Sequence, residues 1–516
     1  MEAKLAMARH KVAVLLACTF IVAACGLIYE LLIGTAASYL SGQSAYQFSL
    51  TVGLFLGAMG IGSFMSRLVH RRLLEAFLLA ELWQAIVGGF SVCLMFGFFA
   101  LSDWYQVGIV AIILVIGVCI GYELPLLTRY LRNYGPLRTV IADVLSLDYL
   151  GGVLGSLAFP IFLLPTLGLM RTAFLVGLLN TFVAAWVFVT FRWQIEGRRF
   201  FALIIAGVTA LLIFGIANSL RWQSWLESEL YDDEIIYAKQ TPFQRIVMTR
   251  WRNDLRLFLD GELQFSSVDE HRYHESLAHP AMSLAKGKER VLVLGGGDGL
   301  LVREVIKYPQ VRTVVLVDID PEMTKLAQKH PALLQLNEGA LQDGKVQIVN
   351  TDAYKFLMDN LRPFDVILID LPDPNTESLA RLYTLEFYRL VARNLKPDGI
   401  VATQATSPFE TRAAFWCIIR TMEASGFKVA PYWVAIPTFG IWGFAAASKE
   451  YRPDLKKVRL TVPTRYLTEP LLKTMAIFPP DCSPVSVGIN RLDNLLLLSH
   501  YLRPTSFMLN GSTRQR

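Results

Sequence analysis

The chain has 516 residues, of which 53% are hydrophobic and 18% are charged, with a formal net charge of +6. The charge is unevenly placed: residues 1–220 are about 10% charged, whereas residues 221–516 reach about 24%, the usual value for a soluble globular domain. This division excludes a single soluble domain, a disordered chain and a disulfide scaffold. Lys and Arg form no run typical of nucleic-acid binding, so we expect no nucleic-acid partner.

Residues 1–220 have the composition of a membrane domain. Seven apolar stretches are long enough to cross a bilayer. They lie near residues 12–33, 48–69, 76–100, 104–126, 143–165, 172–191 and 200–218. Apolar stretches keep following the first, so the first is not a cleaved signal peptide. Small-residue spacings, such as Gly53-xxx-Gly57 with Gly60 and Gly62, and Gly151 with Gly155, predict close helix packing in lipid.

Several acidic residues lie in or beside these apolar stretches, where a charge is costly and often functional. They are Glu30, Glu81, Glu123, Asp143 and Asp148. A structural role at helix ends and a role in amine binding or transport both remain open for them.

The second half of the chain begins with a linking helix and short strands near 235–238, 244–249 and 255–259, which indicate a small β-rich subdomain over 221–285. From Val291, apolar strands alternate with amphipathic helices. The strands are 291–294, 313–318, 346–349, 365–370 and 400–404, and the helices lie around 300–308, 321–330, 353–360, 382–395 and 410–425. This alternation predicts a parallel, doubly wound, Rossmann-like sheet over 286–450. We expect a helical extension over 451–516, with helices near 465–478 and 490–502.

The first of these strands ends in a glycine-rich loop, Gly295-Gly296-Gly297-Asp298-Gly299. A dinucleotide-binding fingerprint would need glycine at position 300, where Leu300 stands, and Asp298 would repel a pyrophosphate. The loop is therefore better suited to a cationic ligand.

Acidic residues also follow the later strands: Asp318, Asp352, Asp370 and Asp373. The carboxyl ends of parallel strands share one edge of the sheet, so these carboxylates and Asp298 should crowd together there. Crowded carboxylates raise one another's pKa values unless a cation shares the site, which favours a polycationic ligand. A metal is the alternative, from His271, His274, Glu275 and His279. Their spacing is not HExxH and no cysteine cluster supports them, so we expect no metal.

Eight short motifs carry a resemblance to a known family. They are TPFQRI (241–246), LFLDGELQ (257–264), DEHRYHE (269–275), GGGDG (295–299), VDIDP (317–321), NTDAYKFL (350–357), DLPDP (370–374) and TQ (403–404). In this order and spacing, residues 231–448 resemble the spermidine synthases, which are polyamine aminopropyltransferases. A membrane half ahead of such a domain resembles the bacterial membrane-bound members.

The resemblance implies transfer of the aminopropyl group of decarboxylated S-adenosylmethionine to putrescine or a related amine, giving spermidine and methylthioadenosine. The donor is a co-substrate, and no prosthetic group is implied. On the donor side the matching positions are Gln244, Asp318 for the ribose, and Asp352 with Ala353 for the adenine. On the amine side they are His274, Asp298, Asp373, Tyr273 and Gln404, with Asp370 as the catalytic acid residue. We also expect a homo-oligomer formed through the catalytic domain.

The sequence departs from the family in the segment after Asp373, on the amine side, and at the adenine position. Asn375-Thr376-Glu377 stands where soluble members usually have Gly-Pro-Ala, and Ala353 replaces a usual glycine. The acceptor is therefore open to being longer than putrescine or a different amine. The alternative functions are an S-adenosylmethionine-dependent methyltransferase and a non-enzymatic polyamine sensor or transporter. Methyltransferases usually place an acid two residues before the first glycine, where this chain has Val293.

The loop charges conflict with the side of the membrane that the chemistry requires. If the predicted spans alternate across the membrane, twelve Lys and Arg residues lie on the same side of the membrane as the N-terminus, and Arg171 alone lies on the opposite side. The positive-inside rule thus places the N-terminus in the cytoplasm, and seven spans would place the catalytic domain outside. The donor is a charged nucleoside made in the cytosol. We therefore predict a multi-pass protein of the cell (inner) membrane, in contact with lipid, whose catalytic domain faces the cytoplasm.

Overall fold

The computed structural model describes residues 2–41, 44–101, 104–231 and 233–502. The chain forms two compact units, unit 1 (Met1–Asp233) and unit 2 (Glu234–Arg516). Each unit has hydrophobic core clusters of its own.

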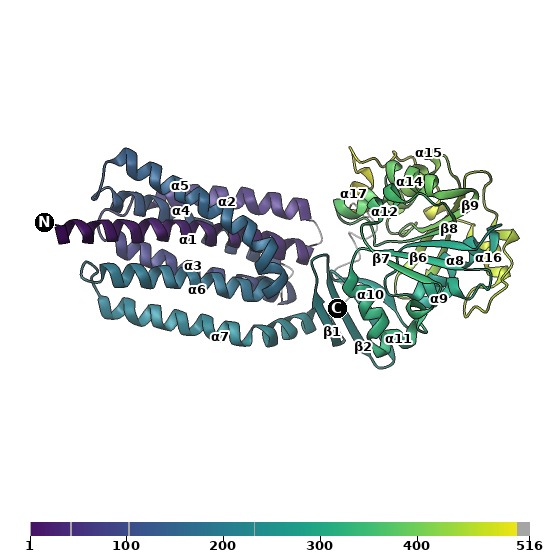
Figure 1. Cartoon of the computed structure of the whole chain (residues 1–516), viewed down its shortest axis with the longest axis horizontal. Helices are drawn as coiled ribbons and strands as arrows, with labels where there is room; N and C mark the ends of the chain where they lie inside the picture. The colour runs from purple at the N-terminus through teal and green to yellow at the C-terminus, as the bar shows by residue number, and fades with distance from the viewer. Residues whose placement is uncertain (1, 42–43, 102–103, 232, 503–516) are drawn as a thin grey trace. The chain divides into compact units, whose positions relative to one another are not determined.

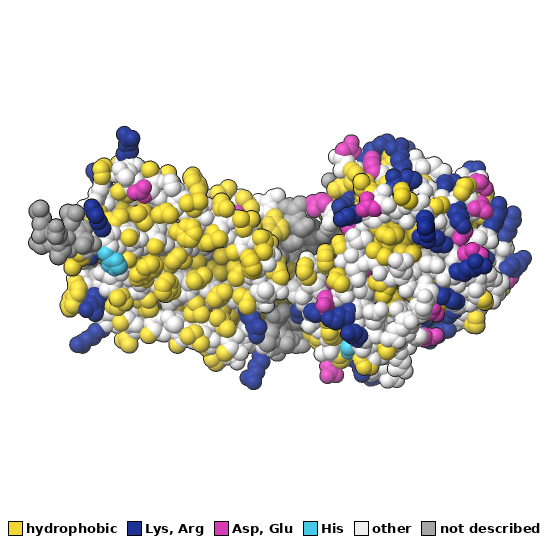
Figure 2. All heavy atoms as spheres, in the orientation of Figure 1, with side chains coloured by type: hydrophobic (Ala, Val, Ile, Leu, Met, Phe, Trp, Pro, Cys, Tyr) yellow, Lys and Arg dark blue, Asp and Glu magenta, His cyan; other side chains and the backbone are white. Residues whose placement is uncertain are grey.

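Unit 1 is a bundle of long apolar helices (Figure 1). They are α1 (Glu2–Ser41), α2 (Ser44–Ser66), α3 (Leu73–Leu101), α4 (Tyr105–Leu131), α5 (Leu137–Ala158), the π-helical turn η1 (Phe159–Leu163), α6 (Leu164–Phe191) and α7 (Arg198–Leu230). Within the described residues, six helical stretches are long and apolar enough to cross a membrane. Large apolar side chains such as Leu56, Phe64 and Leu203 are exposed on the bundle, and Figure 2 shows hydrophobic side chains spread over its flank.

One of the six stretches, Leu137–Phe191, is 55 residues long. As a single helix it would extend roughly 80 Å, far more than the roughly 30 Å of a bilayer core. Gly168 interrupts it with φ +71° and ψ −178°, values that only glycine adopts readily. The stretch therefore holds two helical segments, and Figure 1 shows α5 and α6 running in opposite directions. Counted over the described residues, the bundle thus contains seven segments of membrane-spanning length.

The glycine spacings expected to pack helices do so at some positions only. A Cβ at Gly151 would lie 2.2 Å from the Phe20 carbonyl oxygen of α1, and one at Gly62 would lie 2.0 Å from that of Val118 in α4. At Gly53, Gly57 and Gly60 of α2, by contrast, an added Cβ would meet no described atom within 4 Å. The packing prediction is wrong for these three, because they lie on a face of α2 that no described helix covers.

Unit 2 contains two sheets. The smaller is an antiparallel meander of β1 (Glu234–Gln240), β2 (Arg245–Trp251), β3 (Asp254–Leu259) and β4 (Glu262–Ser266). The larger has the strand order β10-β11-β9-β8-β5-β6-β7. Its strands are β5 (Arg290–Gly295), β6 (Thr313–Asp318), β7 (Val346–Asn350), β8 (Phe364–Asp370), β9 (Leu395–Gln404), β10 (Lys428–Ile436) and β11 (Gly440–Ser448).

Helices cover both faces of the larger sheet. They are α8 (Glu270–Leu284), α9 (Leu300–Ile306), α10 (Pro321–Lys329), α11 (Pro331–Leu336), α12 (Ala353–Asp359), α13 (Glu377–Ala380), α14 (Leu385–Asn394) and α15 (Arg412–Ala424). Alternate residues of β5 join different cores: Val291 packs with α8 and α9, and Leu292 packs with α14 and α15. Burial on both faces explains why the strands are continuously apolar.

The Rossmann-like fold class expected from the sequence is confirmed, with one difference. Strands β5 to β9 are parallel, but β10 and β11 form a hairpin that joins β9 antiparallel, so the sheet is mixed. The C-terminal extension is also less helical than expected. Within its described part, two short α-helices, α16 (Glu469–Met475) and α17 (Leu496–Tyr501), and two 3-10 helices, η4 (Leu455–Lys457) and η5 (Pro480–Cys482), stand among turns and extended chain.

Candidate active site

The carboxyl ends of β5, β6 and β8 form the edge at which the predicted acids lie. After β7 the chain crosses to the other side of β5, so β5 lies between β8 and β6. The register places Gly295 beside Asp370 and Asp318 beside Asn350. A sheet of this kind binds ligands in the crevice where the strand order reverses, and here that point lies between β5 and β8.

The glycine loop after β5 brings the backbone against two of these acids. The Gly297 N–H donates to Asp318 Oδ2 at 3.1 Å, and a Cβ at Gly297 would lie 2.4 Å from that oxygen. A Cβ at Gly296 would lie 2.9 Å from Asp370 Oδ2. At Gly295, φ is +79° and a Cβ would lie 1.9 Å from the Asp370 carbonyl oxygen. Side chains are therefore excluded at Gly295, Gly296 and Gly297, because the backbone there lies against Asp318 and Asp370.

The acids around the loop influence one another's ionisation. The pKa of Asp318 is raised to about 6, mainly by burial and also by the charges of Asp320 and Asp298. Burial raises the pKa of Asp298 as well, while its Oδ1 accepts the N–H of Leu300 at 2.9 Å. This agrees with the expectation that crowded carboxylates resist ionisation until a cation joins them.

Asp370 closes β8 and is half-buried. The Tyr273 hydroxyl of α8 donates to Asp370 Oδ1 at 2.7 Å. Burial raises the pKa of Asp370 to about 6, although the positive charge of His274 and the Tyr273 hydrogen bond both oppose the rise. A carboxylate with this pKa accepts a proton near neutral pH more readily than an ordinary aspartate does.

Asp373 follows Asp370 by one turn and is held by two side chains. Gln404 Nε2, at the end of β9, donates to Asp373 Oδ1 at 3.1 Å, and the Tyr501 hydroxyl of α17 donates to Oδ2 at 2.9 Å. Burial raises the pKa of Asp373 to about 7, although both hydrogen bonds oppose the rise. The C-terminal extension therefore contributes a contact to this edge of the sheet.

His274 of α8 belongs to a buried network of charged side chains next to these acids. Its Nδ1 lies 2.8 Å from Glu270 Oε2. Arg303 Nη1 and Nη2 donate to Glu270 Oε1 and Oε2 at 3.0 and 2.9 Å, which makes a bidentate ion pair. Burial alone would lower the pKa of His274, but the hydrogen bond and charge of Glu270 raise it to about 9. His274 is thus held as a cation, and its charge acts on Asp298 and Asp370.

The residues predicted for the donor side lie around β6 and β7. Gln244 Nε2 donates at 3.0 Å to Asp320 Oδ2, two residues beyond Asp318. Asp352 caps α12 by accepting the Lys355 N–H at 3.1 Å and also pairs with Arg381. Ala353 is buried at the start of α12. Asp352 therefore serves as the N-cap of α12, and this role is compatible with donor binding.

The chain is similar to known proteins over nearly its whole length. The model of the spermine/spermidine synthase domain matches residues 270–457. A polyamine aminopropyltransferase of Leptospira interrogans is 43% identical over 494 residues, which cover 95% of this chain and 98% of the relative. The chain belongs to the polyamine aminopropyltransferase family.

Other members are similarly close. The polyamine aminopropyltransferase of Oceanobacillus iheyensis is 44% identical over 89% of this chain and 90% of its own, and that of Mycobacterium tuberculosis is 37% identical over 93% and 94%. The crystal structure of spermidine synthase from Thermotoga maritima covers 48% of this chain and 85% of its own, with 30% identity and a TM-score of 0.44. The polyamine aminopropyltransferase relatives span both units, so the enzyme is a transferase of polyamine biosynthesis rather than a methyltransferase or a non-enzymatic sensor.

Sequence reasoning missed the residues that support the site from a distance. Tyr501 lies in a tail with no recognised motif, so nothing in the sequence links it to Asp373. Glu270 stands in the DEHRYHE motif, four residues before His274, and that spacing puts the two on one face of α8. The Arg303 partner lies beyond the glycine loop and is joined to Glu270 only by the fold.

The residues weighed as metal ligands have other contacts in unit 2. His279 bonds Tyr308 and Glu304 at 3.0 Å each, and Glu275 accepts three backbone N–H groups from residues 465–467. These contacts fasten α8 to α9 and to the C-terminal extension. Three of these four side chains, those of His274, Glu275 and His279, are thus engaged in the packing around α8.

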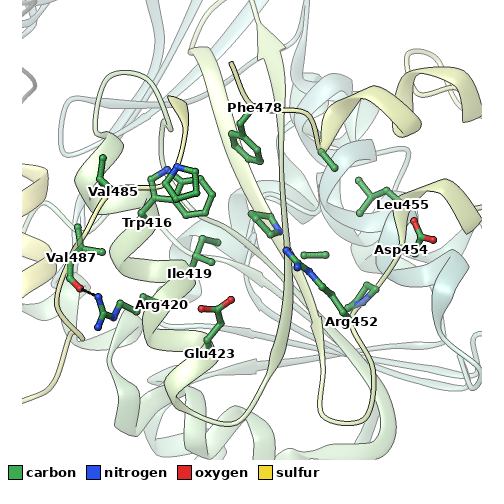
Figure 3. A pocket seen from close by; sticks show the side chains of 15 residues that line it. Trp416, Ile419, Arg420, Glu423, Arg452, Asp454, Leu455, Phe478, Val485 and Val487 are labelled. Atoms are coloured by element: carbon green, nitrogen blue, oxygen red, sulfur yellow. Dashed lines mark hydrogen bonds between the residues drawn. The ribbon is translucent and has the colours of Figure 1, made fainter. Parts of the chain in front are cut away.

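A surface hollow of about 770 Å³ lies elsewhere in unit 2, between α15, β10 and the C-terminal extension (Figure 3). Trp416, Phe478, Arg420 and Arg452 are among its lining residues. Arg420 donates to the carbonyl oxygen of Val487 and so fastens the extension. None of the predicted site residues lines this hollow.

Proposed function

We propose that the enzyme transfers the aminopropyl group of decarboxylated S-adenosylmethionine to putrescine or a related aliphatic amine. An amine nitrogen attacks the methylene carbon beside the sulfonium, a C–N bond forms and the C–S bond breaks. The sulfur leaves as the neutral thioether of methylthioadenosine, and the nitrogen loses one proton. Family membership supports this reaction. The carboxylates at the carboxyl ends of β5, β6 and β8 support it as well, because a cationic donor and a cationic acceptor both require negative charge.

On the donor side, Asp318 is proposed to bind the ribose hydroxyls, since it ends β6 against the glycine loop at the spacing suited to that contact. Asp352 and Ala353 at the end of β7 would hold the adenine, and Gln244 would contact the thioadenosine part. The glycine loop would let the donor approach the backbone closely.

On the amine side, Asp370 is proposed as the catalytic residue. Tyr273 engages its Oδ1 at 2.7 Å, which leaves Oδ2 as the oxygen to take the amine proton. An alkylammonium has a pKa of roughly 10, so it must lose a proton before it can attack. The pKa of Asp370, about 6, makes it a better base than an ordinary aspartate. Asp298, His274 and Asp373 with Gln404 would orient the acceptor, which supplies the proximity contribution.

The observation that carries the proposal is the position of Asp370. It lies opposite Gly295 where the strand order reverses between β5 and β8, and it accepts a hydrogen bond from Tyr273. The test is to give the purified full chain decarboxylated S-adenosylmethionine and putrescine and to follow both products by mass spectrometry. We expect methylthioadenosine and spermidine in equal amounts without added metal. Methyl transfer from intact S-adenosylmethionine, with no methylthioadenosine from the decarboxylated donor, would refute it.

The acceptor's length is addressed by the same assay with a panel of amines. The segment after Asp373 differs from soluble members, and Tyr501 reaches Asp373 from the extension. We propose putrescine as the acceptor, with a longer amine such as spermidine as the alternative. The ratio of kcat/KM values for the two amines selects between them.

We infer that unit 1 crosses the cell membrane in contact with lipid and that unit 2 faces the cytoplasm. Figure 2 shows Lys and Arg at the end of the bundle that holds the N-terminus, and α7 leaves the bundle at the opposite end. The positive-inside rule therefore favours an external unit 2. The need for a cytosolic sulfonium donor, which does not cross lipid unaided, favours the cytoplasm, and we give it greater weight.

A reporter that fluoresces only in the cytoplasm, fused after Arg516 or before Met1, tests the orientation. We expect a bright C-terminal fusion and, with seven segments, a dark N-terminal one. The reverse pattern would show that the positive-inside rule prevails and that transfer takes place outside the cytoplasm. Self-association through unit 2 stays a prediction, to be measured by light scattering of the purified chain.

A further inference from the structure

The core of unit 1 holds a group of large buried polar side chains from four helices, beside hydroxyl side chains such as Thr19 and Ser91 that bond to their own helix. The group consists of Tyr29 of α1, Glu81 and Gln84 of α3, Glu123 of α4 and Asn180 of α6, and each of these is at most 1% exposed. Among the described residues, none of their side-chain nitrogen or oxygen atoms has a hydrogen-bond partner. Buried polar atoms are almost always paired in native proteins, so a cluster of unpaired ones indicates a bound group.

Three of the side chains meet on one face of α3. Glu81, Gln84 and Gly88 recur at helical spacing and so lie on the same side of that helix. Tyr29 crosses from α1 to this face: a Cβ at Gly88 would lie 2.7 Å from the Tyr29 hydroxyl oxygen. The phenol therefore lies within one helical turn of Gln84.

Asn180 reaches the same face from α6. A Cβ at Gly177 would lie 2.7 Å from the Ala85 carbonyl oxygen, and one at Gly89 would lie 3.9 Å from that of Ala173. Gly177 thus lies against Ala85 and Ala173 lies against Gly89, so the two helices run antiparallel. One turn beyond Gly177, Asn180 is accordingly level with Glu81.

Glu123 completes the group from α4. The charge of Glu81 acts on Glu123, and the charges of both act on Tyr29. In the part of the chain that the structure describes, neither carboxylate forms an ion pair, and the Arg72–Glu196 pair of unit 1 belongs to the loops. Glu81 lies roughly 12 Å along α3 from its start, well inside the apolar span. Two carboxylates this deep in lipid require protons or a cation.

We propose that this group, the intramembrane acid site (Tyr29, Glu81, Gln84, Glu123 and Asn180), binds an aliphatic amine that carries two or more positive charges. Two carboxylates match two ammonium groups in number, and the amide and phenol oxygens accept their remaining N–H donors. The surrounding apolar side chains suit a methylene spacer. The choice of an amine over another cation rests on the proposed function, because the same chain handles amines in unit 2.

The site is less suited to a metal ion. No cluster of three or more His, Cys, Asp or Glu side chains that could hold one occurs among the described residues. Hard cations prefer a cage of oxygen ligands at short range, whereas two carboxylates with amide and phenol groups on separate helices suit an elongated ligand. A membrane site for amines in the same chain as an amine-using catalytic unit would receive either its substrate or its product.

The first experiment measures equilibrium binding of radiolabelled putrescine and spermidine to the full chain in nanodiscs. An Asp370→Asn, Asp373→Asn background weakens the amine site of unit 2. We expect one saturable amine per chain to remain, and Glu81→Gln with Glu123→Gln to reduce its affinity at least tenfold. Asp143→Asn is the matched control, because Asp143 is an exposed acid of α5 in the same bundle. Unchanged binding in the Glu81, Glu123 double variant would overturn the proposal.

A second measurement does not depend on how well the variants fold. Dicyclohexylcarbodiimide reacts with carboxyl groups in apolar surroundings, and peptide mass spectrometry locates the adducts. We expect adducts on Glu81 and Glu123 that spermidine suppresses and that sodium ions or butane-1,4-diol do not. Equal labelling with and without amine, or equal protection by sodium ions, would overturn the proposal in favour of a proton or metal site.

The two proposals can fail separately. Glu81→Gln with Glu123→Gln should release methylthioadenosine within about twofold of the parent rate in detergent, because neither residue belongs to unit 2. Normal methylthioadenosine release without amine binding in the bundle would reject the intramembrane acid site alone. Absence of methylthioadenosine release by the parent chain, with amine binding in the bundle retained, would reject the proposed reaction alone.

Discussion

Replacing Tyr273 by phenylalanine removes one hydroxyl and with it one hydrogen bond to Asp370, the proposed catalytic base. The Tyr273 hydroxyl donates to Asp370 Oδ1 at 2.7 Å and lowers the pKa of that carboxyl, which burial raises to about 6. A hydrogen bond to a charged group contributes about 1.5–3 kcal/mol. Water at the half-buried Asp370 recovers part of this, so we expect a net loss of about 1.4 kcal/mol, or about one pKa unit.

The sign follows from the charge. The hydrogen bond favours the carboxylate, so its loss favours the protonated acid and moves the pKa of Asp370 upward, from about 6 to about 7. If Asp370 is the base, the acidic limb of the kcat/KM profile moves with it. At pH 6 the ionised fraction falls from about one half to about one tenth, a roughly fivefold loss, whereas at pH 8 the loss is about 10%.

The assay is methylthioadenosine release across pH 5 to 9 at subsaturating amine. Tyr432→Phe is the matched control: Tyr432 is also buried, its hydroxyl donates to the Ser276 carbonyl oxygen at 2.8 Å, and its ring stacks on Phe444, which Tyr273 also contacts. That variant should lose some stability and keep the parent pH profile. An unmoved acidic limb in Tyr273→Phe, or an equal shift in Tyr432→Phe, would refute the reasoning.

Three further changes test other parts of the site. Asp370→Asn should lower kcat by about 10²–10⁴ with the donor KM changed only a few-fold, as steady-state kinetics with varied donor would measure; near-parental turnover would move the base elsewhere. Tyr501→Phe should raise the acceptor KM about threefold or more at pH 7, and further at lower pH, because the pKa of Asp373, about 7, rises when the hydrogen bond that lowers it is lost. An unchanged acceptor KM would leave Tyr501 a packing residue. Glu270→Gln should destabilise the chain by about 3–5 kcal/mol, since it leaves buried positive charge unpaired. The pKa of His274 is raised to about 9, so the stability that the His274–Glu270 pair contributes is complete below pH 6.5 and is lost as pH rises through 9. The pKa of Glu270 is lowered to about 2, so the stability that its carboxylate contributes is complete above pH 4.5 and is lost as pH falls through 2. Thermal melts should show the alkaline decline in the parent and not in the variant.

The sequence by itself determined the two-part organisation and the position of the acids. Apolar stretches of spanning length mark unit 1, because only helices satisfy their backbone groups inside lipid. In unit 2, strands buried on both faces are continuously apolar, and an acid directly after such a strand must lie at the edge of the sheet. The places of Asp318 and Asp370 follow from this periodicity. The order of the motifs then indicated the family, since several short matches at fixed spacing are seldom accidental.

Only the tertiary structure decided which side chains touch. The contact of Tyr501 with Asp373 joins residues 128 positions apart, and local pattern cannot encode such a pairing. The antiparallel β10–β11 hairpin likewise depends on how the last strands meet β9. In unit 1 the sequence placed Glu81 and Glu123 in apolar stretches, but their meeting with Tyr29 and Asn180 depends on how four helices pack. Helix packing is set by side-chain shape over long separations, whereas periodicity is a property of neighbours along the chain.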